Sequence, residues 1–180
     1  METFENQITE SSLIELQNKV EKSAWKNSKY ELVKLASTTQ KGNFGEDVTK
    51  KAFNSIGIEC VIKNEQRRGD WDTQISMNAL NKYFENKLAT EDTHGNFQFN
   101  GVKLNREYDF LFCLGVSHNQ LYFKIISKSE LETKKEWSFG SMTKKNETED
   151  KQTLSYKVTI PKSQMIPMDE FQNFDFNSLF

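Results

Sequence analysis

The stretch "GDWDTQISMNALNKYFENKLA", residues 69–89, predicts a β-hairpin. Its segments "WDTQIS" and "YFENKLA" are typical of strands, and "MNALNK" between them is typical of a turn. Side chains two residues apart on a strand point to the same face, so Glu85 and Lys87 lie on one face. The hairpin brings Asp72 or Asp70 close to Glu85. We expect Asp72, which lies nearer the strand, and keep Asp70 as the alternative.

This hairpin gathers the groups that a metal-dependent hydrolase needs. Two neighbouring carboxylates repel each other unless a cation neutralises them. Mg²⁺ suits such a pair, because it binds carboxylate oxygens and keeps its remaining waters. A lysine beside the ion can orient a water molecule, or help to deprotonate it, for in-line attack. Phosphodiester hydrolysis requires this nucleophile and positive charge on the developing phosphorane, so the hairpin predicts that chemistry.

Hydrophobic periodicity predicts the elements on either side of the hairpin. Before the hairpin, we expect two amphipathic helices within 10–37 with capping boxes at Ser12–Glu15 and Ser28–Glu31, a helix from about Phe44 to Ile56 ended by Gly57, and a strand at 58–65. After the hairpin, we expect a polar irregular stretch with a short helix at 91–107, a buried strand at 108–117 and its hairpin partner at 120–127. A charged loop at 143–152 and a strand at 155–165 ended by Pro161 follow. This order predicts an α/β (α+β) fold with a central mixed β-sheet flanked by helices.

Composition excludes several classes of protein. The 180 residues suit one domain, and a net charge of -2 with a pI of about 5.8 argues against DNA binding through bulk charge. The sequence predicts neither a transmembrane helix nor a signal peptide. Its two cysteines lack zinc-ligand spacing, and its glycines form no phosphate-binding loop. We therefore expect a cytoplasmic protein without a membrane segment, zinc or a nucleotide cofactor.

These residues resemble the PD-(D/E)XK nuclease superfamily, whose best-known members are the type II restriction endonucleases. The resemblance rests on the glutamate of "GNFGEDVTKKAF", the aspartate of "GDWDTQ" and the Glu-X-Lys of "FENKLA", and it covers roughly residues 42–126. It implies a restriction-endonuclease-like core in which Asp72 and Glu85 bind Mg²⁺. It also implies that Lys87 assists the attacking water and that Glu46 supports the metal site.

The same resemblance suggests how the chain is organised. We expect a single nuclease domain with an N-terminal helical segment (1–40), a catalytic core (42–126) and a C-terminal extension (127–180). The Phe-rich end of the extension covers either the core or a dimer interface. The N-terminal helices are either a dimer element or a cap on the core. Cutting both strands of a duplex needs two active sites, which predicts a homodimer on double-stranded DNA.

Two groups of polar residues flank the hairpin. The cations before its first strand suit phosphate contacts or an ordinary surface loop, and they are Lys63, Arg67 and Arg68. The polar residues after its second strand suit hydrogen bonds to bases or the capping of turns, and they are His94, Asn96, Gln98 and Asn100.

The predicted function is therefore Mg²⁺-dependent, sequence-specific cleavage of double-stranded DNA that leaves 5′-phosphate ends. One alternative is a structure-specific nuclease of the same fold, such as a junction resolvase or a repair nuclease. The other is a non-catalytic DNA-binding module. Glu85 and Lys87 taken by themselves also suit an ordinary solvated strand face.

Overall fold

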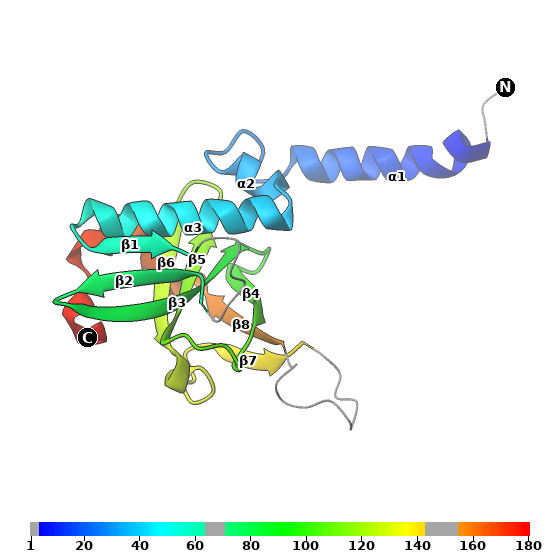
Figure 1. The fold of residues 1–180 in the computed structure, drawn as a ribbon. Helices are drawn as coiled ribbons and strands as arrows, with labels where there is room; N and C mark the ends of the chain where they lie inside the picture. The colour runs from blue at the N-terminus through cyan, green and yellow to red at the C-terminus, as the bar shows by residue number, and fades with distance from the viewer. Residues whose placement is uncertain (1–3, 64–70, 143–154) are drawn as a thin grey trace.

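Helices and a small second sheet cover a central mixed sheet (Figure 1). The computed structural model describes residues 4–63, 71–142 and 155–180. The α-helices are α1 (Phe4–Glu21), α2 (Glu31–Leu35) and α3 (Thr38–Ser55). The strands are β1 (Glu59–Ile62), β2 (Thr73–Met77), β3 (Leu80–Thr90), β4 (Asn96–Val102), β5 (Phe110–Val116), β6 (Leu121–Ser127), β7 (Ser138–Ser141), β8 (Tyr156–Pro161) and β9 (Ile166–Pro167). The 3-10 helices are η1 (Lys128–Glu130), η3 (Lys162–Gln164), η4 (Met168–Asn173) and η5 (Phe176–Leu179).

The strands form two sheets. Sheet A has the order β1-β2-β3-β5-β6-β9, and sheet B has the order β4-β8-β7. Neighbouring strands are antiparallel except β3 and β5, which run parallel. The mixed α/β class is therefore confirmed, as are the strands expected at 58–65 (β1), 108–117 (β5), 120–127 (β6) and 155–165 (β8). Residues 64–65 and the expected charged loop at 143–152 lie outside the described residues.

The predicted hairpin is formed by β2 and β3. Asn78 and Ala79 at its tip both have positive φ, at 53° and 62°, as a tight two-residue hairpin turn requires. This turn fixes the register, in which Thr73 pairs with Phe84. The pairing ends at Thr73, and the Asp72 N–H then donates to the Phe84 carbonyl while the Asn86 N–H donates to Asp72 Oδ2, so Asp72 lies close to Glu85 at the end of the ladder, as expected.

The connection between the parallel strands β3 and β5 contains β4. The expectation of an irregular stretch with a short helix at 91–107 is therefore wrong. Phe97 and Phe99 are buried, whereas Gln98 and Asn100 between and after them are exposed. This is the two-residue period of a half-buried strand, and the polar content of the segment concealed it.

Helix α3 begins earlier than the expected start near Phe44. Ser37 and Gln40 form a capping box in which the Gln40 N–H donates to Ser37 Oγ at 3.3 Å and the Ser37 N–H donates to Gln40 Oε1 at 2.9 Å. These bonds satisfy two otherwise unpaired donors, so the helix starts at Thr38. Gly57, with a φ of 79°, follows the helix end as predicted.

The two capping boxes predicted nearer the N-terminus are wrong. Helix α1 runs through Ser12, so this serine does not begin a helix. Helix α2 begins after Tyr30, which makes no side-chain cap bond, and the Glu31 side chain instead accepts from the Asn27 N–H at 3.0 Å. Both predictions used a four-residue pattern that also occurs by chance in polar sequence.

Sheet A has an apolar layer on each face. On β3, Phe84 and Leu88 face α3 and the C-terminal segment, whereas Tyr83 and Ala89 face sheet B. Phe53 of α3 lies at the centre of the first layer and contacts four aromatic rings, those of Phe84, Phe112, Phe171 and Phe176. The Phe-rich C-terminus therefore covers the core of this chain.

Helix α1 extends away from the rest of the protein (Figure 1). Its apolar side chains Leu13, Leu16 and Val20 are each more than half exposed, so α1 is not a cap on the core. The segment boundary expected at residues 40–42 falls inside α3, and the C-terminal extension supplies β8 to sheet B and β9 to sheet A. No helix among the described residues is long and apolar enough to span a membrane.

We predict that Phe53→Ala lowers the free energy of unfolding by about 3–5 kcal/mol, because it removes a fully buried ring and leaves a cavity. Urea unfolding followed by circular dichroism measures this change. Leu32→Ala, on the exposed surface of α2, is the control and should change stability by less than about 0.5 kcal/mol. Equal effects of the two substitutions would contradict this account of the core.

Candidate active site

The Asp72 carboxylate lies where the ladder between β2 and β3 ends. The Asp72 N–H donates to the Phe84 carbonyl at 2.8 Å. The next N–H of β3 to bond here, that of Asn86, donates to the Asp72 side chain instead of to a backbone carbonyl, at 2.8 Å to Oδ2. On the other side, the Lys63 N–H donates to the Asp72 carbonyl at 2.9 Å. Asp72 is thus fixed between two strands, and its second oxygen, Oδ1, accepts no hydrogen bond from the described residues.

Glu85 is a fully buried carboxylate held by two cations. Lys87 Nζ lies 2.6 Å from Glu85 Oε1. Arg106 donates through Nη1 to both oxygens, at 2.9 Å to Oε1 and 2.7 Å to Oε2. A buried carboxylate keeps its charge only where such partners replace water. The burial of Glu85 excludes the alternative of an ordinary solvated strand face.

The two carboxylates influence each other. Burial raises the pKa of Asp72 above the ordinary value of 3.8, and the neighbouring Glu85 charge raises this pKa further. The Asn86 N–H, Lys87 and Arg106 act in the opposite direction and lower the same pKa. Burial is therefore the main reason that the charged form of Asp72 is disfavoured, and the Glu85 charge adds to it.

Tyr108 lies beneath this group, in the layer between the sheets. Burial and the Glu85 charge both raise the pKa of its hydroxyl. That hydroxyl is buried and has no hydrogen-bond partner among the described residues. Lys128 lies 5.0 Å from the centre of the Tyr108 ring and donates a hydrogen bond to the Arg106 carbonyl. These contacts fix the backbone of the segment that carries Arg106.

Glu46 approaches β3 from the α3 side, near Asn86 and Lys87. Glu46 and Asn86 line a cavity of about 30 Å³, which is large enough for a water molecule. The Asn86 side chain accepts from Thr73 Oγ1 at 3.4 Å, but its buried Nδ2 has no partner among the described residues. The structure thus brings Asp72, Glu85 and Lys87 together and places Glu46 beside Asn86.

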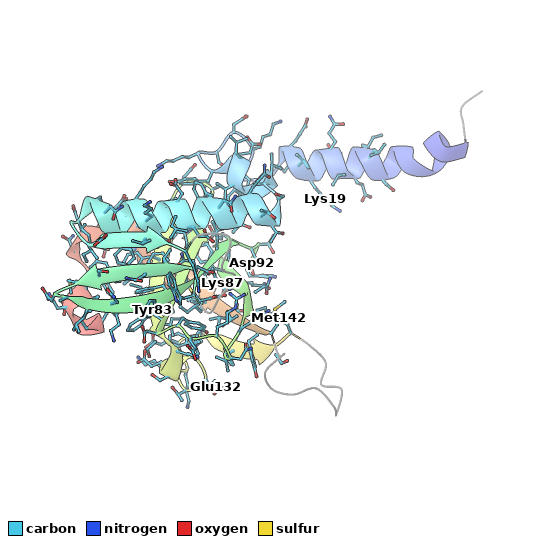
Figure 2. The ribbon with its side chains drawn as sticks, viewed as in Figure 1. Lys19, Tyr83, Lys87, Asp92, Glu132 and Met142 are labelled. Carbon is cyan, nitrogen blue, oxygen red and sulfur yellow. The ribbon has the colours of Figure 1, made fainter. Side chains whose placement is uncertain are left out.

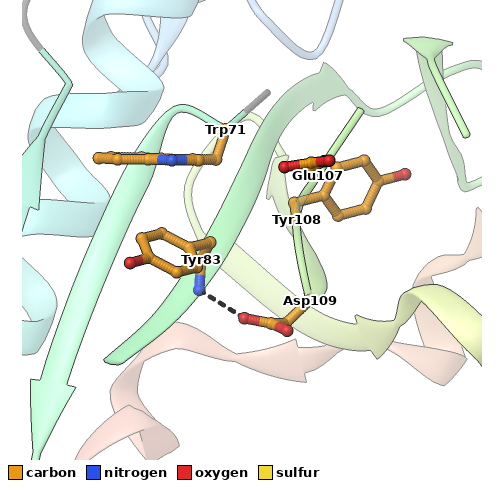
Figure 3. A pocket seen from close by; sticks show the side chains of 5 residues that line it. All are labelled: Trp71, Tyr83, Glu107, Tyr108 and Asp109. Atoms are coloured by element: carbon orange, nitrogen blue, oxygen red, sulfur yellow. Dashed lines mark hydrogen bonds between the residues drawn. The ribbon is translucent and has the colours of Figure 1, made fainter. Parts of the chain in front are cut away.

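A larger pocket of about 470 Å³ opens beside the carboxylates (Figure 3). The rings of Trp71 and Tyr83 pack with centroids 5.0 Å apart, and Glu107, Tyr108 and Asp109 complete the lining. The Tyr83 N–H donates to Asp109 Oδ2 at 2.9 Å, which fixes this wall. The pocket is therefore aromatic and acidic, and its lining residues Trp71 and Tyr83 are close in sequence to Asp72 and Glu85.

The predicted phosphate contacts are described only in part. Lys63 lies near the site, with its Nζ 4.5 Å from the centre of the Trp71 ring. Arg67, Arg68 and the alternative ligand Asp70 lie outside the described residues.

The predicted base contacts lie farther along the chain. Figure 2 shows Tyr83, Lys87 and Asp92 following one another along β3 and the segment after it. Asp92 accepts hydrogen bonds from the backbone N–H groups of His94 and Asn96, both at 2.9 Å, and from Gln98 Nε2 at 3.0 Å. These bonds cap the turn that leads into β4, which is the structural role that the sequence left open. Gln98 and Asn100 lie on the exposed face of β4.

Sequence reasoning missed Arg106 and Tyr108. Both lie just before β5; Arg106 falls in the stretch expected to be irregular at 91–107, and Tyr108 is the first residue of the strand expected at 108–117. Their approach to Glu85 depends on the parallel pairing of β5 with β3. The available signal was the cluster "REYD" (106–109), directly before the most apolar strand.

The donor set fits Mg²⁺ in a minimal form. The described residues contain no cluster of three or more His, Cys, Asp or Glu side chains that could hold a metal. Asp72 and Glu85 are two carboxylates, however, and Mg²⁺ usually takes one or two carboxylates with waters and substrate phosphates as its other ligands. Asp72 Oδ1, which accepts no hydrogen bond from the described residues, is a suitable first ligand.

No family model matches the chain, and no curated protein matches it. The functional argument therefore rests on the residues and their geometry.

We predict that Asp72→Asn stabilises the metal-free protein at pH 7. The raised pKa means that folding disfavours the charged carboxylate, so this cost is present at neutral pH and disappears below the ordinary pKa of 3.8. The difference in unfolding free energy between variant and wild type should therefore shrink as the pH falls through this range. Chemical denaturation from pH 3 to 7 measures it, and a stability loss at pH 7 would contradict the assignment.

Proposed function

We propose that this protein is a Mg²⁺-dependent endonuclease of the PD-(D/E)XK type that cleaves double-stranded DNA. The observation that carries the proposal is the proximity of Asp72 to Glu85, since Asp72 is hydrogen-bonded to the residues on either side of Glu85, with Lys87 Nζ 2.6 Å from the Glu85 carboxylate. These are the three side chains that the motif requires, and they come together on one side of sheet A. The perturbed pKa of Asp72 at the end of a strand ladder further supports a functional role.

The topology supports a restriction-endonuclease-like core. Helix α3 precedes the antiparallel strands β1, β2 and β3, and β5 then pairs with β3 in parallel. This is a central mixed sheet in which β3 carries Glu85 and Lys87, and Asp72 directly precedes β2. Fold analogy alone does not establish an activity, so the proposal depends on the side chains.

In the proposed mechanism, Asp72 and Glu85 would hold the ion. When bound, Mg²⁺ would supply positive charge to the phosphoryl group and lower the pKa of a coordinated water. Lys87 places an ammonium group beside Glu85, where it can donate a hydrogen bond to the attacking water or to the phosphate. The Asn86 N–H holds Asp72 in place through its 2.8 Å bond to Oδ2, so both carboxylates are positioned before substrate binds.

The free, buried state of the two cysteines is consistent with the proposed cytoplasmic location. Cys60 and Cys113 are both free and buried, and burial raises the pKa of the Cys60 thiol to about 11. Inert, reduced thiols are typical of proteins in reducing compartments.

We predict that the purified protein cuts plasmid DNA with Mg²⁺ into discrete fragments with 5′-phosphate ends, and that EDTA stops the reaction. Lys87→Ala and Asp72→Ala should each lower the cleavage rate by about a hundredfold or more, because the first removes the ammonium group beside the reacting phosphate and the second removes a proposed Mg²⁺ ligand. Lys162→Ala is the matched control. It breaks the ion pair between Lys162 Nζ and Glu91 Oε1, which is 3.0 Å long and does not involve Asp72, Glu85 or Lys87.

Other outcomes would separate the alternatives. Preferential cutting of branched DNA would favour a structure-specific nuclease. DNA binding without cleavage, unchanged in the Lys87→Ala and Asp72→Ala variants, would favour a non-catalytic module and overturn the proposed activity.

The proposal includes a homodimer, because cleavage of both strands needs two sites. We predict that a second copy packs against α1, whose exposed side chains Leu13, Leu16 and Val20 lie on one helical stripe. Sedimentation equilibrium should give twice the chain mass of 21.0 kDa, and a Leu13→Glu/Leu16→Glu variant should give the monomer mass. Leu80→Glu, at the exposed hairpin tip, is the control. A dimer that survives the double substitution would place the interface elsewhere.

A further inference from the structure

Arg106 occupies the acceptor sites of Glu85 that a metal ion would need. Arg106 Nη1 donates to Oε1 at 2.9 Å and to Oε2 at 2.7 Å, while Lys87 Nζ lies 2.6 Å from Oε1. A carboxylate offers about four lone-pair sites. With three of them engaged, Glu85 has little capacity for another cation unless one of its present partners leaves.

The charges lead to the same conclusion. The formal charges of Asp72, Glu85, Lys87 and Arg106 sum to zero, so the group is neutral as it stands. A divalent cation would add two positive charges within hydrogen-bonding range of the same oxygens. Cations that share one carboxylate repel each other strongly in a partly buried site. A stable metal complex would therefore release one of the two resident cations.

Of the two cations bound to Glu85, Arg106 is the one that can be displaced more easily. Its side chain is 31% exposed, compared with 20% for Lys87, which is fixed on the same strand as Glu85. The Arg106 carbonyl is held by the hydrogen bond from Lys128 Nζ, so its backbone can stay in place while the side chain turns. The released guanidinium would remain within a side chain's length of the site, and guanidinium groups bind phosphate oxygens through paired hydrogen bonds.

We propose that Arg106 is an exchangeable counter-ion. It neutralises Glu85 while metal is absent, competes with the divalent cation for Glu85, and passes to a DNA phosphate once the metal has displaced it. The inference rests on the proposed function in one respect, namely that Asp72 and Glu85 hold the metal. It adds an ordered exchange, in which metal binding makes an arginine available to the substrate.

The test compares wild type with Arg106→Gln by calorimetric titration of Ca²⁺, a hard oxygen-seeking cation. We expect the variant to bind Ca²⁺ about tenfold more tightly, because the competitor is gone. We then expect its affinity for duplex DNA at saturating Ca²⁺ to fall about fivefold or more, with less than a twofold change in EDTA. A merely structural role for Arg106 would not move the two affinities in opposite directions. Lys162→Gln is the control and should change neither.

The outcomes distinguish this inference from the proposed function. If Arg106→Gln binds Ca²⁺ as wild type does, or more weakly, the exchange is overturned while the metal site stands. If the Ca²⁺ titration produces no heat of binding with either wild type or Glu85→Gln, the proposed metal site is contradicted. The proposed exchange is then contradicted as well. If near-ultraviolet circular dichroism shows that Arg106→Gln is not folded, Arg106→Lys decides the matter. Lysine keeps the positive charge but cannot form the paired hydrogen bonds of the guanidinium group. Arg106→Lys should therefore raise the Ca²⁺ affinity and lower the DNA affinity as Arg106→Gln does, each by a smaller factor.

Discussion

The burial of the Glu85 carboxylate is the constraint on which the rest of the site depends. A charge without water must be matched by partners that come close enough to replace it. Lys87 is provided by the same strand, two residues along. Arg106 is provided by a segment 21 residues later in the chain, which must return to β3 to reach the carboxylate. The route through β4 and the parallel pairing of β5 with β3 accomplish this return.

The two apolar layers explain why Glu85 is buried at all. Helix α3 and the C-terminal phenylalanines cover one face of sheet A, and sheet B covers the other. Both faces of β3 and β5 are therefore shielded, as expected for parallel neighbours at the centre of a sheet. Access remains where β2 and β3 stop pairing, beyond Thr73, and Asp72 lies at that point. The fold thus places the Glu85 carboxylate in the interior and the Asp72 carboxylate where the pairing of β2 and β3 ends.

Local patterns allowed the hairpin, β5, β6 and the Asp72–Glu85–Lys87 group to be predicted, because turn chemistry and the two-residue period act over a few residues. The contact between Arg106 and Glu85 depends instead on which strands become neighbours, and no short segment encodes that. Strand β4 was missed because its two buried phenylalanines alternate with polar residues that also suit a loop. The start of α3 was missed because Gly42 and Gly45 are typical of a break in a helix. The Ser37–Gln40 capping box and the packing of Gly45 against Leu88 nevertheless support a helix there.

The cost of this arrangement argues for function. The site contains two neighbouring carboxylates and a raised Asp72 pKa, while the buried Asn86 Nδ2 and Tyr108 hydroxyl beside it have no partner among the described residues. Each of these features opposes folding, and apolar side chains of similar volume at positions 85 and 108 would avoid several of them. The adjacent positions of β5 show that the surrounding layers accept such residues, since Leu111 and Cys113 are fully buried there. Several unfavourable polar groups gathered around one pair of carboxylates are expected where a ligand or a reaction requires them.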